Sequence, residues 1–420
     1  MLSRYSAAAA LWLSFSCLSP VWAQAVSPLS LRDAVQRALG SNPRLTAADR
    51  DIGIATGRRV QAGAIPNPEV SFEADNVLGT GAYRGTKSAE TTLQLGQLIE
   101  LGGKRSARVA AGSAELDAAY YQRSAVRLEV ISDAAVAFFN VLGAQRRIAI
   151  FDTHAAALQR LIPLLQRRVD AGASSFAEVA RAQVAADLVR ADRERARTSL
   201  AIAKLELATL MGVSRVDFGQ ATGDFTRTGI VPSFGVIRRA VEGNPQLVKF
   251  TALRAQRDAE LLIARLKAVP DLRAGVAWRH FNDTNDNAVR VGVSIPIPVF
   301  DQNRGGILEA QEQRAKVEAE ASIARAGLLL TLGRAYETLS GAAKEAEILR
   351  GSLPNARRAV ESMESGYSQG RFTLLELLDV HNSAAQAALR ELDALLSFHV
   401  SLATIEGLIG TPLHLSGGSR

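Results

Sequence analysis

The chain has 420 residues, a formal net charge of +7, 5% aromatic residues and one cysteine, Cys17. Its basic and acidic residues are interspersed without a basic block. This pattern is typical of helix faces exposed to solvent and does not indicate a nucleic-acid partner. Because no cysteine follows Cys17, disulfides, thiolate metal sites and thiol catalysis are excluded from the rest of the chain.

The first 23 residues have the pattern of a secretory signal peptide. Arg4 supplies the positive charge, an apolar stretch follows, and residues 21–23 place small residues at the cleavage positions. We expect the mature chain to begin at Gln24. Cys17 lies inside this segment, but the leucine that a lipoprotein signal carries three residues earlier is missing, so lipidation is not expected. Beyond this segment no run of about 18 apolar residues occurs, which predicts no transmembrane helix.

Residues 24–212 are predicted to form a first structural repeat. Ser30 begins a short amphipathic helix, and Asn42-Pro43 begins a second one. Two strands of alternating polarity follow, joined by a glycine-rich loop. A helix of roughly 100 Å, at 1.5 Å per residue, then extends to Gly172, and a shorter helix returns to Gly212. The predicted strands are about 69–78 and 90–99, and the predicted long helix is about 103–171.

A connector at 213–232 leads to a second repeat, 233–420. Asn42-Pro43 recurs as Asn244-Pro245, and the glycines that end the two helices recur as Gly370 and Gly410, each about 200 residues later. Landmarks in the same order at nearly the same offset indicate a tandem duplication. In this half the predicted strands are about 271–281 and 288–299, and the predicted long helix is about 303–369.

The four predicted strands are apolar on one face and have the length of transmembrane β-strands. An open sheet in lipid would leave backbone N–H and C=O groups unpaired, so closure requires other copies of the chain. Three copies would supply twelve strands, an even number in the range of such barrels. The predicted fold is therefore mostly α with a small β part: antiparallel coiled α-hairpins forming a trimeric α-barrel, plus a 12-stranded transmembrane β-barrel. A soluble hairpin that packs on a core is the alternative.

Two junctions between a strand and a long helix carry a resemblance to a known family. They are GQLIELGGKR, residues 96–105, and IPIPVFDQNRG, residues 295–305. Over nearly all of the mature sequence the chain resembles the TolC-like outer-membrane efflux ducts, and both junctions resemble the CzcC-type branch, which serves heavy-metal resistance–nodulation–division pumps. The resemblance implies a homotrimer in outer-membrane lipid, a long periplasmic α-barrel, a periplasmic adaptor and an inner-membrane pump.

The two turns that follow the long helices are expected at the periplasmic tip. Glycine permits the tight reversal, and Ser175 or Thr373 can cap the returning helix. By themselves these residues predict only turns, whereas the resemblance implies that they dock the adaptor. The predicted docking residues are Gly172, Ala173, Ser174, Ser175, Gly370, Arg371, Phe372 and Thr373.

Glu376 and Asp379 stand three residues apart and so share a helix face. In a trimer they would form two stacked acidic rings, which concentrate cations at a narrow opening. The alternative is that they are ordinary carboxylates, favoured near a helix N-terminus by the helix dipole. The resemblance implies that they line the constriction of the duct.

The resemblance also assigns Glu178 and Tyr367 to the network that closes the duct. The chain departs from the family at Phe372, where an arginine often serves in the gate, although Arg371 precedes it. The closed state is therefore expected to depend on packing or on a shifted ion pair.

Histidines are scattered and no local motif offers a set of metal ligands, so we expect no resident metal and no cofactor. No catalytic set or phosphate loop is visible, so we expect no enzyme. The favoured function is a passive export duct, for heavy-metal cations. The alternatives are the same duct for drugs or other small molecules, and a secreted structural coiled-coil protein.

Overall fold

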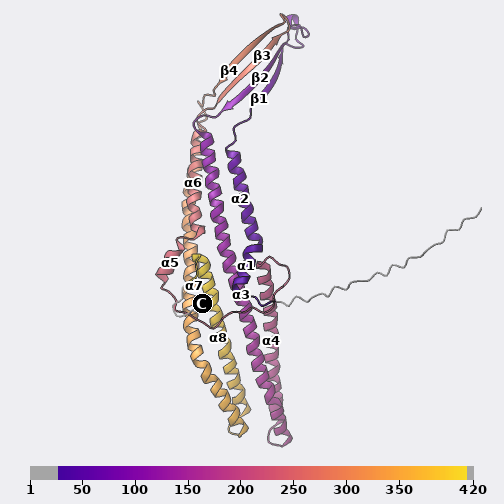
Figure 1. The fold of residues 1–420 in the computed structure, drawn as a ribbon, viewed down its shortest axis with the longest axis vertical. Helices are drawn as coiled ribbons and strands as arrows, with labels where there is room; N and C mark the ends of the chain where they lie inside the picture. The colour runs from indigo at the N-terminus through magenta and orange to yellow at the C-terminus, as the bar shows by residue number, and fades with distance from the viewer. Residues whose placement is uncertain (1–26, 414–420) are drawn as a thin grey trace, which may run out of the picture.

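The computed structural model describes residues 27–413 of the chain. The predicted signal peptide, with Cys17, and residues 414–420 lie outside the described residues. What is described is a long rod of helices with a small sheet at one end (Figure 1). The expected fold class, mostly α with a small antiparallel sheet of four strands, is confirmed.

The described part of the chain passes through the same order of elements twice. The first series is α1 (Leu31–Ser41), α2 (Pro43–Ala62), β1 (Glu69–Asp75), the short 3-10 helix η1 (Gly81–Tyr83), β2 (Glu90–Ile99), α3 (Lys104–Asp170) and α4 (Phe176–Leu210). The second is α5 (Phe234–Val241), α6 (Pro245–Leu266), β3 (Leu272–Phe281), β4 (Asp286–Ser294), α7 (Arg304–Ser368) and α8 (Leu374–Ile409). The division into structural repeats 24–212 and 233–420 stays a proposal, which this order supports.

The same local device begins α2 and α6. Asn42 caps α2 by accepting a hydrogen bond from the backbone N–H of Arg44, and Asn244 caps α6 through Gln246. A proline follows each cap, where its missing N–H costs nothing. Each asparagine also donates to a carbonyl near the end of its repeat, Asn42 to Leu210 and Asn244 to Leu408. Each cap therefore joins the start of its repeat to the end.

The helices form a single curved layer. In the half of the rod away from the sheet, α4 packs on α3, α3 on α8, and α8 on α7. In the half nearer the sheet, α2 packs on α3, α3 on α6, and α6 on α7. The long helices α3 and α7 continue through Pro163 and Pro354. Consequently α7 forms one edge of the layer, and α2 and α4 together form the other.

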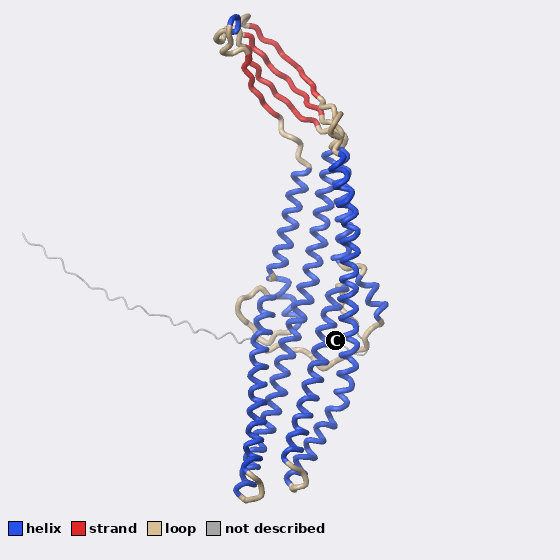
Figure 2. Tube along the Cα trace, turned by 180° about the vertical axis from the view of Figure 1, so that it is seen from behind, coloured by secondary structure: helices blue, strands red, loops and turns tan. Residues whose placement is uncertain are grey.

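Of the described helices, α8 is long and apolar enough to cross a membrane, by length and composition. The sequence predicts no such helix, because a count of uninterrupted apolar residues misses one whose average hydropathy is high. Packing explains the apolar character: Leu377, Leu392 and Phe398 are buried where α8 lies between α3 and α7. Figure 2 shows this helix in the part of the rod away from the sheet.

The sheet is antiparallel, with the order β1-β2-β3-β4. Its central pair joins the two halves of the chain, from Glu90 opposite Phe281 to Ile99 opposite Leu272. Strands β1 and β4 are unpaired edges, and they lie on the same sides as α2 and α7 respectively (Figure 1). Large apolar side chains of the edge strands are exposed: Val70, Phe72, Val289, Val291 and Val293.

Two strands end earlier than predicted. The strand predicted at 69–78 ends at Asp75, because Asn76 has a left-handed backbone with φ of 58°. The strand predicted at 288–299 is β4, Asp286–Ser294. Alternation continues beyond Ser294, but Pro296 and Pro298 have no N–H to donate to a neighbouring strand. The alternating polarity thus overestimated the length of β4, whereas in β1 it stops at Asp75, where the strand ends.

Candidate functional site at the helical tip

The predicted docking turns lie side by side at the end of the rod away from the sheet (Figures 1 and 2). One joins α3 to α4 and the other joins α7 to α8. Gly172 and Gly370 have φ of 70° and 72°, the left-handed region in which a side chain is strained. The reversal of each hairpin therefore depends on a glycine.

Of the two predicted caps, Thr373 makes the capping bond and Ser175 does not. Thr373 Oγ1 accepts from the backbone N–H of Glu376, whose carboxylate accepts from the backbone N–H of Thr373 at 2.8 Å. These reciprocal bonds are a capping box, and the N–H bond of Thr373 lowers the pKa of Glu376. At the other turn, Ser174 Oγ donates to Glu178 Oε2 at 2.5 Å.

Tyr367 connects the two hairpins of the chain. Its side chain is buried, and its hydroxyl donates to Glu178 Oε2 at 3.4 Å. The Arg168 guanidinium lies 5.0 Å from the centre of the Tyr367 ring, and it donates to the Tyr367 carbonyl at 3.3 Å. Burial, followed by the nearby charge of Glu178, raises the pKa of Tyr367. The structure thus brings together Glu178 and Tyr367, which the resemblance singled out.

The sequence analysis did not identify Arg168 as a functional residue. The available signal was a basic residue in the last turn of α3, where the helix dipole favours a cation. That signal is shared by many helices, and it gives no indication of a partner on α7.

Phe372 and Arg371 contact different partners. The Phe372 ring lies against Gly366, so close that a Cβ atom at that glycine would be 2.4 Å from the ring. Arg371 donates to the Gln369 side chain within its own turn. The position at which the family often has an arginine is therefore held here by packing, and Arg371 is not drawn to Glu178.

Glu376 and Asp379 are both exposed at the start of α8. The Glu376 carboxylate is turned back onto Thr373 by the capping box, whereas Asp379 lies almost one helical turn further on. Within residues 27–413 no group of three or more His, Cys, Asp or Glu side chains is placed to hold a metal ion.

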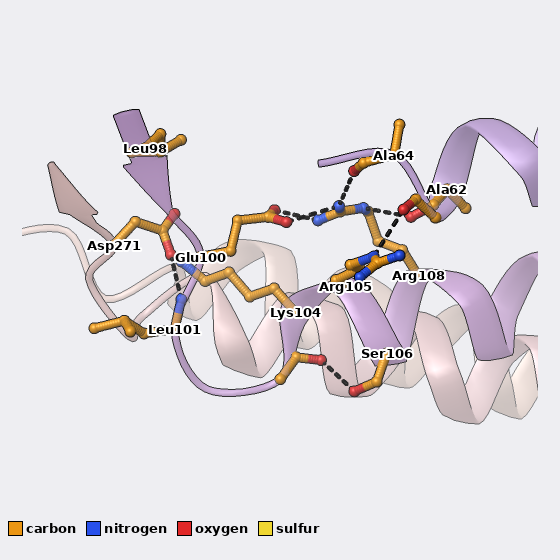
Figure 3. Close-up of polar contacts among 12 residues, drawn as sticks. Ala62, Ala64, Leu98, Glu100, Leu101, Lys104, Arg105, Ser106, Arg108 and Asp271 are labelled. Carbon is orange, nitrogen blue, oxygen red and sulfur yellow. Dashed lines mark hydrogen bonds and ion pairs between the residues drawn. The ribbon is translucent and has the colours of Figure 1, made fainter. Parts of the chain in front are cut away.

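A second polar cluster lies at the opposite end of the rod, where the strands meet the helices (Figure 3). The Arg108 guanidinium forms an ion pair with Glu100 and also donates to the Ala62 carbonyl. Lys104 Nζ lies 2.7 Å from an Asp271 oxygen, which also accepts from the backbone of residue 101. The hydrogen bond from Arg108 lowers the pKa of Glu100.

Glu100 and Lys104 fall within the segment 96–105 that carried the family resemblance, but the sequence did not reveal their partners. Asp271 comes from the other half of the chain, between α6 and β3. Both ion pairs attach the sheet to α3, because Glu100 directly follows β2 and Asp271 directly precedes β3.

The model of the outer membrane efflux protein family matches residues 34–213 and 236–411. The cobalt-zinc-cadmium resistance protein CzcC of Cupriavidus metallidurans is 30% identical over 92% of this chain and 91% of its own length. The outer membrane protein TolC of Escherichia coli is 22% identical over 91% of this chain and 82% of its own length. A crystal structure of CusC superposes with a TM-score of 0.78 at 17% identity, covering 97% of this chain and 99% of that one, which shows a shared fold.

Proposed function

Because the chain belongs to the outer membrane efflux protein family, we propose that it is the outer-membrane exit duct of a tripartite efflux system and passively conducts heavy-metal cations. The partners in this proposal are a periplasmic adaptor and an inner-membrane pump of the resistance–nodulation–division class. The proposal assigns the chain conduction and no catalytic step.

The observation that carries the proposal is the pair of open edges. Strand β1 and helices α2 and α4 form one edge of the molecule, and β4 and α7 form the other. Two different edges on one chain form a head-to-tail interface, and repeated copies close into a ring when the rotation fits. Three copies supply twelve strands, which removes the sheet edges that lipid cannot solvate. The chain is therefore proposed to act as a trimer.

The tip supports a gate. The contacts of Tyr367 with Glu178 and Arg168 tie the two hairpins together, so breaking them is required before the hairpins separate. We assign the exposed turns around Gly172 and Gly370 to adaptor docking. In the trimer, Glu376 and Asp379 are proposed to form acidic rings that admit cations in preference to anions.

The cargo is proposed from the relatives. CzcC is named for cobalt, zinc and cadmium resistance and shares 30% identity with this chain, against 22% for TolC. Export of drugs or other small molecules by the same fold is the second candidate. It is favoured by the match to the pyoverdine export outer membrane protein OpmQ of Pseudomonas putida, which is 25% identical over 87% of this chain.

Growth of a deletion strain tests the function. Loss of the chain is expected to raise sensitivity to cobalt, zinc and cadmium, and the intact gene should restore resistance. Sensitivity to organic compounds alone would favour the second candidate. A soluble monomer in cell extracts, with no protein in the outer membrane, would contradict the duct and favour the secreted coiled-coil alternative.

A further inference from the structure

A cavity of about 660 Å³ lies between the two helical hairpins, on the sheet side of the tip. Its walls come from α3, α7 and α8, with Phe225 and Thr226 of the connector closing one side. Two histidines line it from opposite hairpins, His154 on α3 and His381 on α8. Neither belongs to the tip contacts described above.

Both imidazoles are poorly placed to carry a charge. The Nε2 atom of His154 is buried and has no hydrogen-bond partner within residues 27–413. His381 is 5% exposed, and its Nε2 lies 3.2 Å from Glu364 Oε1 but is not aligned for a hydrogen bond. An imidazolium in such surroundings loses hydration. The protein replaces it at His381 only with the nearby Glu364 carboxylate, and at His154 with no hydrogen bond from the described residues.

Burial is the largest cause that lowers the pKa of each ring. For His154 the next cause is the charge of His381, which shows that the rings are near enough to repel one another when both are protonated. For His381 the next cause is Glu364, which raises the pKa, and the smaller effect of Arg160 lowers it. Asp192 of α4 raises the pKa of His154, but for both rings the effect of burial prevails.

Other charged groups also line the cavity. They are Arg146 on α3, Arg357 and Glu361 on α7, and Glu391 on α8. When Arg160, Glu364 and Asp192 are added, each of the two hairpins contributes both positively and negatively charged side chains near the histidines. The lining therefore carries no large excess of positive or negative charge near the histidines. What distinguishes the two histidines is that they are buried between the two hairpins.

We propose that His154 and His381 form a proton-sensitive joint, which holds the two hairpins together when neutral and favours their separation when the surroundings become acidic. The consequence for conduction rests on the proposed duct function, because separating the hairpins would open the tip. Parting the hairpins admits water to both rings and removes the cost of charging them.

The direction follows from proton binding. The closed form has lowered histidine pKa values, so it binds fewer protons than a parted form with ordinary values of about 6.5. Above that pH both forms are neutral and closure is unaffected. As the pH falls below about 6.5, the population of the parted form relative to the closed form rises by up to about tenfold per pH unit for each extra proton that the parted form binds.

Spin labels on the two turns measure the separation directly. Ala173→Cys and Ser368→Cys place one thiol on each hairpin, and no cysteine follows Cys17 in the sequence, so the labelling is selective. In trimers with one labelled protomer, the long-distance population is expected to rise at least several-fold between pH 7.5 and pH 5.5. The rise should disappear in H154Q/H381Q and persist in the control H280Q, a substitution of a histidine on β3.

A pH response that is equal in the original chain and in H154Q/H381Q would overturn the proposal, and so would the absence of any response in the original chain. Should the double variant fail to form trimers, H154Q alone serves as the test, with a reduced pH slope expected and an unchanged slope contradicting the joint. Conductance in a planar bilayer at pH 7.5 tests the duct separately. If the protein conducts but the distance between the two turns does not change with pH, the proton-sensitive joint is refuted and the duct function still stands.

Discussion

At the scale of residues, the gate proposed here differs from a purely ionic lock. Tyr367 makes one hydroxyl bond to Glu178, and its ring lies beneath Arg168. One turn later Phe372 packs on Gly366. In the proposed gate, the hydrogen bond to Glu178 and the contact with Arg168 link the two hairpins. The packing of Phe372 on Gly366 lies within the α7–α8 hairpin and shapes its turn.

Tyr367→Phe removes the hydroxyl and keeps the buried ring. Because the bond to Glu178 is long, at 3.4 Å, we expect a loss of about 1 kcal/mol, roughly a fivefold shift toward the open form. Single-channel recording should show correspondingly more frequent opening. Tyr120→Phe, at an exposed tyrosine of α3, is the matched control, and equal behaviour of the two variants would exclude a role for the hydroxyl.

Gly366→Ala and Gly341→Ala make opposite predictions within α7. A Cβ at Gly341 meets open space, so the greater helix propensity of alanine should stabilise the protein by up to about 1 kcal/mol. A Cβ at Gly366 would be 2.4 Å from the Phe372 ring, and overpacking of this kind costs about 1–3 kcal/mol. Thermal unfolding of the purified protein measures both. Equal stabilisation by the two alanines would show that Phe372 moves aside freely.

At the scale of elements, the junction of the sheet with α3 is fastened by charged pairs. Arg108 with Glu100 and Lys104 with Asp271 are mostly shielded from solvent, and both attach strand ends to the first turns of α3. Figure 3 shows how Arg108 also reaches the chain that leads from α2 to β1. The orientation of the sheet on the rod thus depends on two carboxylates.

Glu100→Gln should reduce stability in a pH-dependent manner. The folded pKa of Glu100 is lowered by the hydrogen bond from Arg108, so its contribution is present above the usual value of about 4.3 and is lost as the pH falls through the lowered value. The melting temperature of the variant should lie below that of the original chain at pH 7, and the two should converge in acid. The exposed Glu312 of α7 is the control, since Glu312→Gln should change little. A difference in melting temperature between the variant and the original chain that does not change with pH would refute the ionic explanation.

At the scale of the whole molecule, the edges of the helical layer expose apolar side chains. Val184 and Leu188 of α4 are exposed, and so are Ile323 and Ile348 of α7. In the proposed trimer the edge formed by α2 and α4 of one copy lies beside α7 of the next, which would bury these side chains. The edge pairing that closes the sheet then also closes the helical barrel.

Leu188→Glu is expected to weaken the trimer. Burying a leucine contributes about 2 kcal/mol, and a carboxylate in the same interface adds a desolvation cost. The mass of the protein in mild detergent should shift toward monomer. Val236→Glu changes an equally apolar, exposed residue on α5, which packs on α7 and α8 outside the layer, and it should leave the mass unchanged. A full trimer in the Leu188 variant would place the interface elsewhere.

Most local elements and both turns at the tip were predictable from the amino-acid sequence alone. The caps at Asn42 and Asn244, and the reversals at Gly172 and Gly370, depend on the backbone preferences of a few adjacent residues, so they are visible without a partner. The same reasoning failed where alternation continued past the last paired residue, after Ser294. Hydrogen bonding in a sheet requires two strands, whereas alternating polarity describes the sequence of only one of them.

The contacts between residues far apart in the chain became visible only in the folded protein. Arg168 meets Tyr367, and Lys104 meets Asp271, across separations of 199 and 167 residues, which no spacing rule within one helix anticipates. His154 and His381 became a candidate joint only when packing placed them on opposite walls of one cavity. Local structure follows from short-range sterics and hydrogen bonds, whereas the proposed gate and the proposed joint depend on long-range packing of two hairpins that the chain encodes separately.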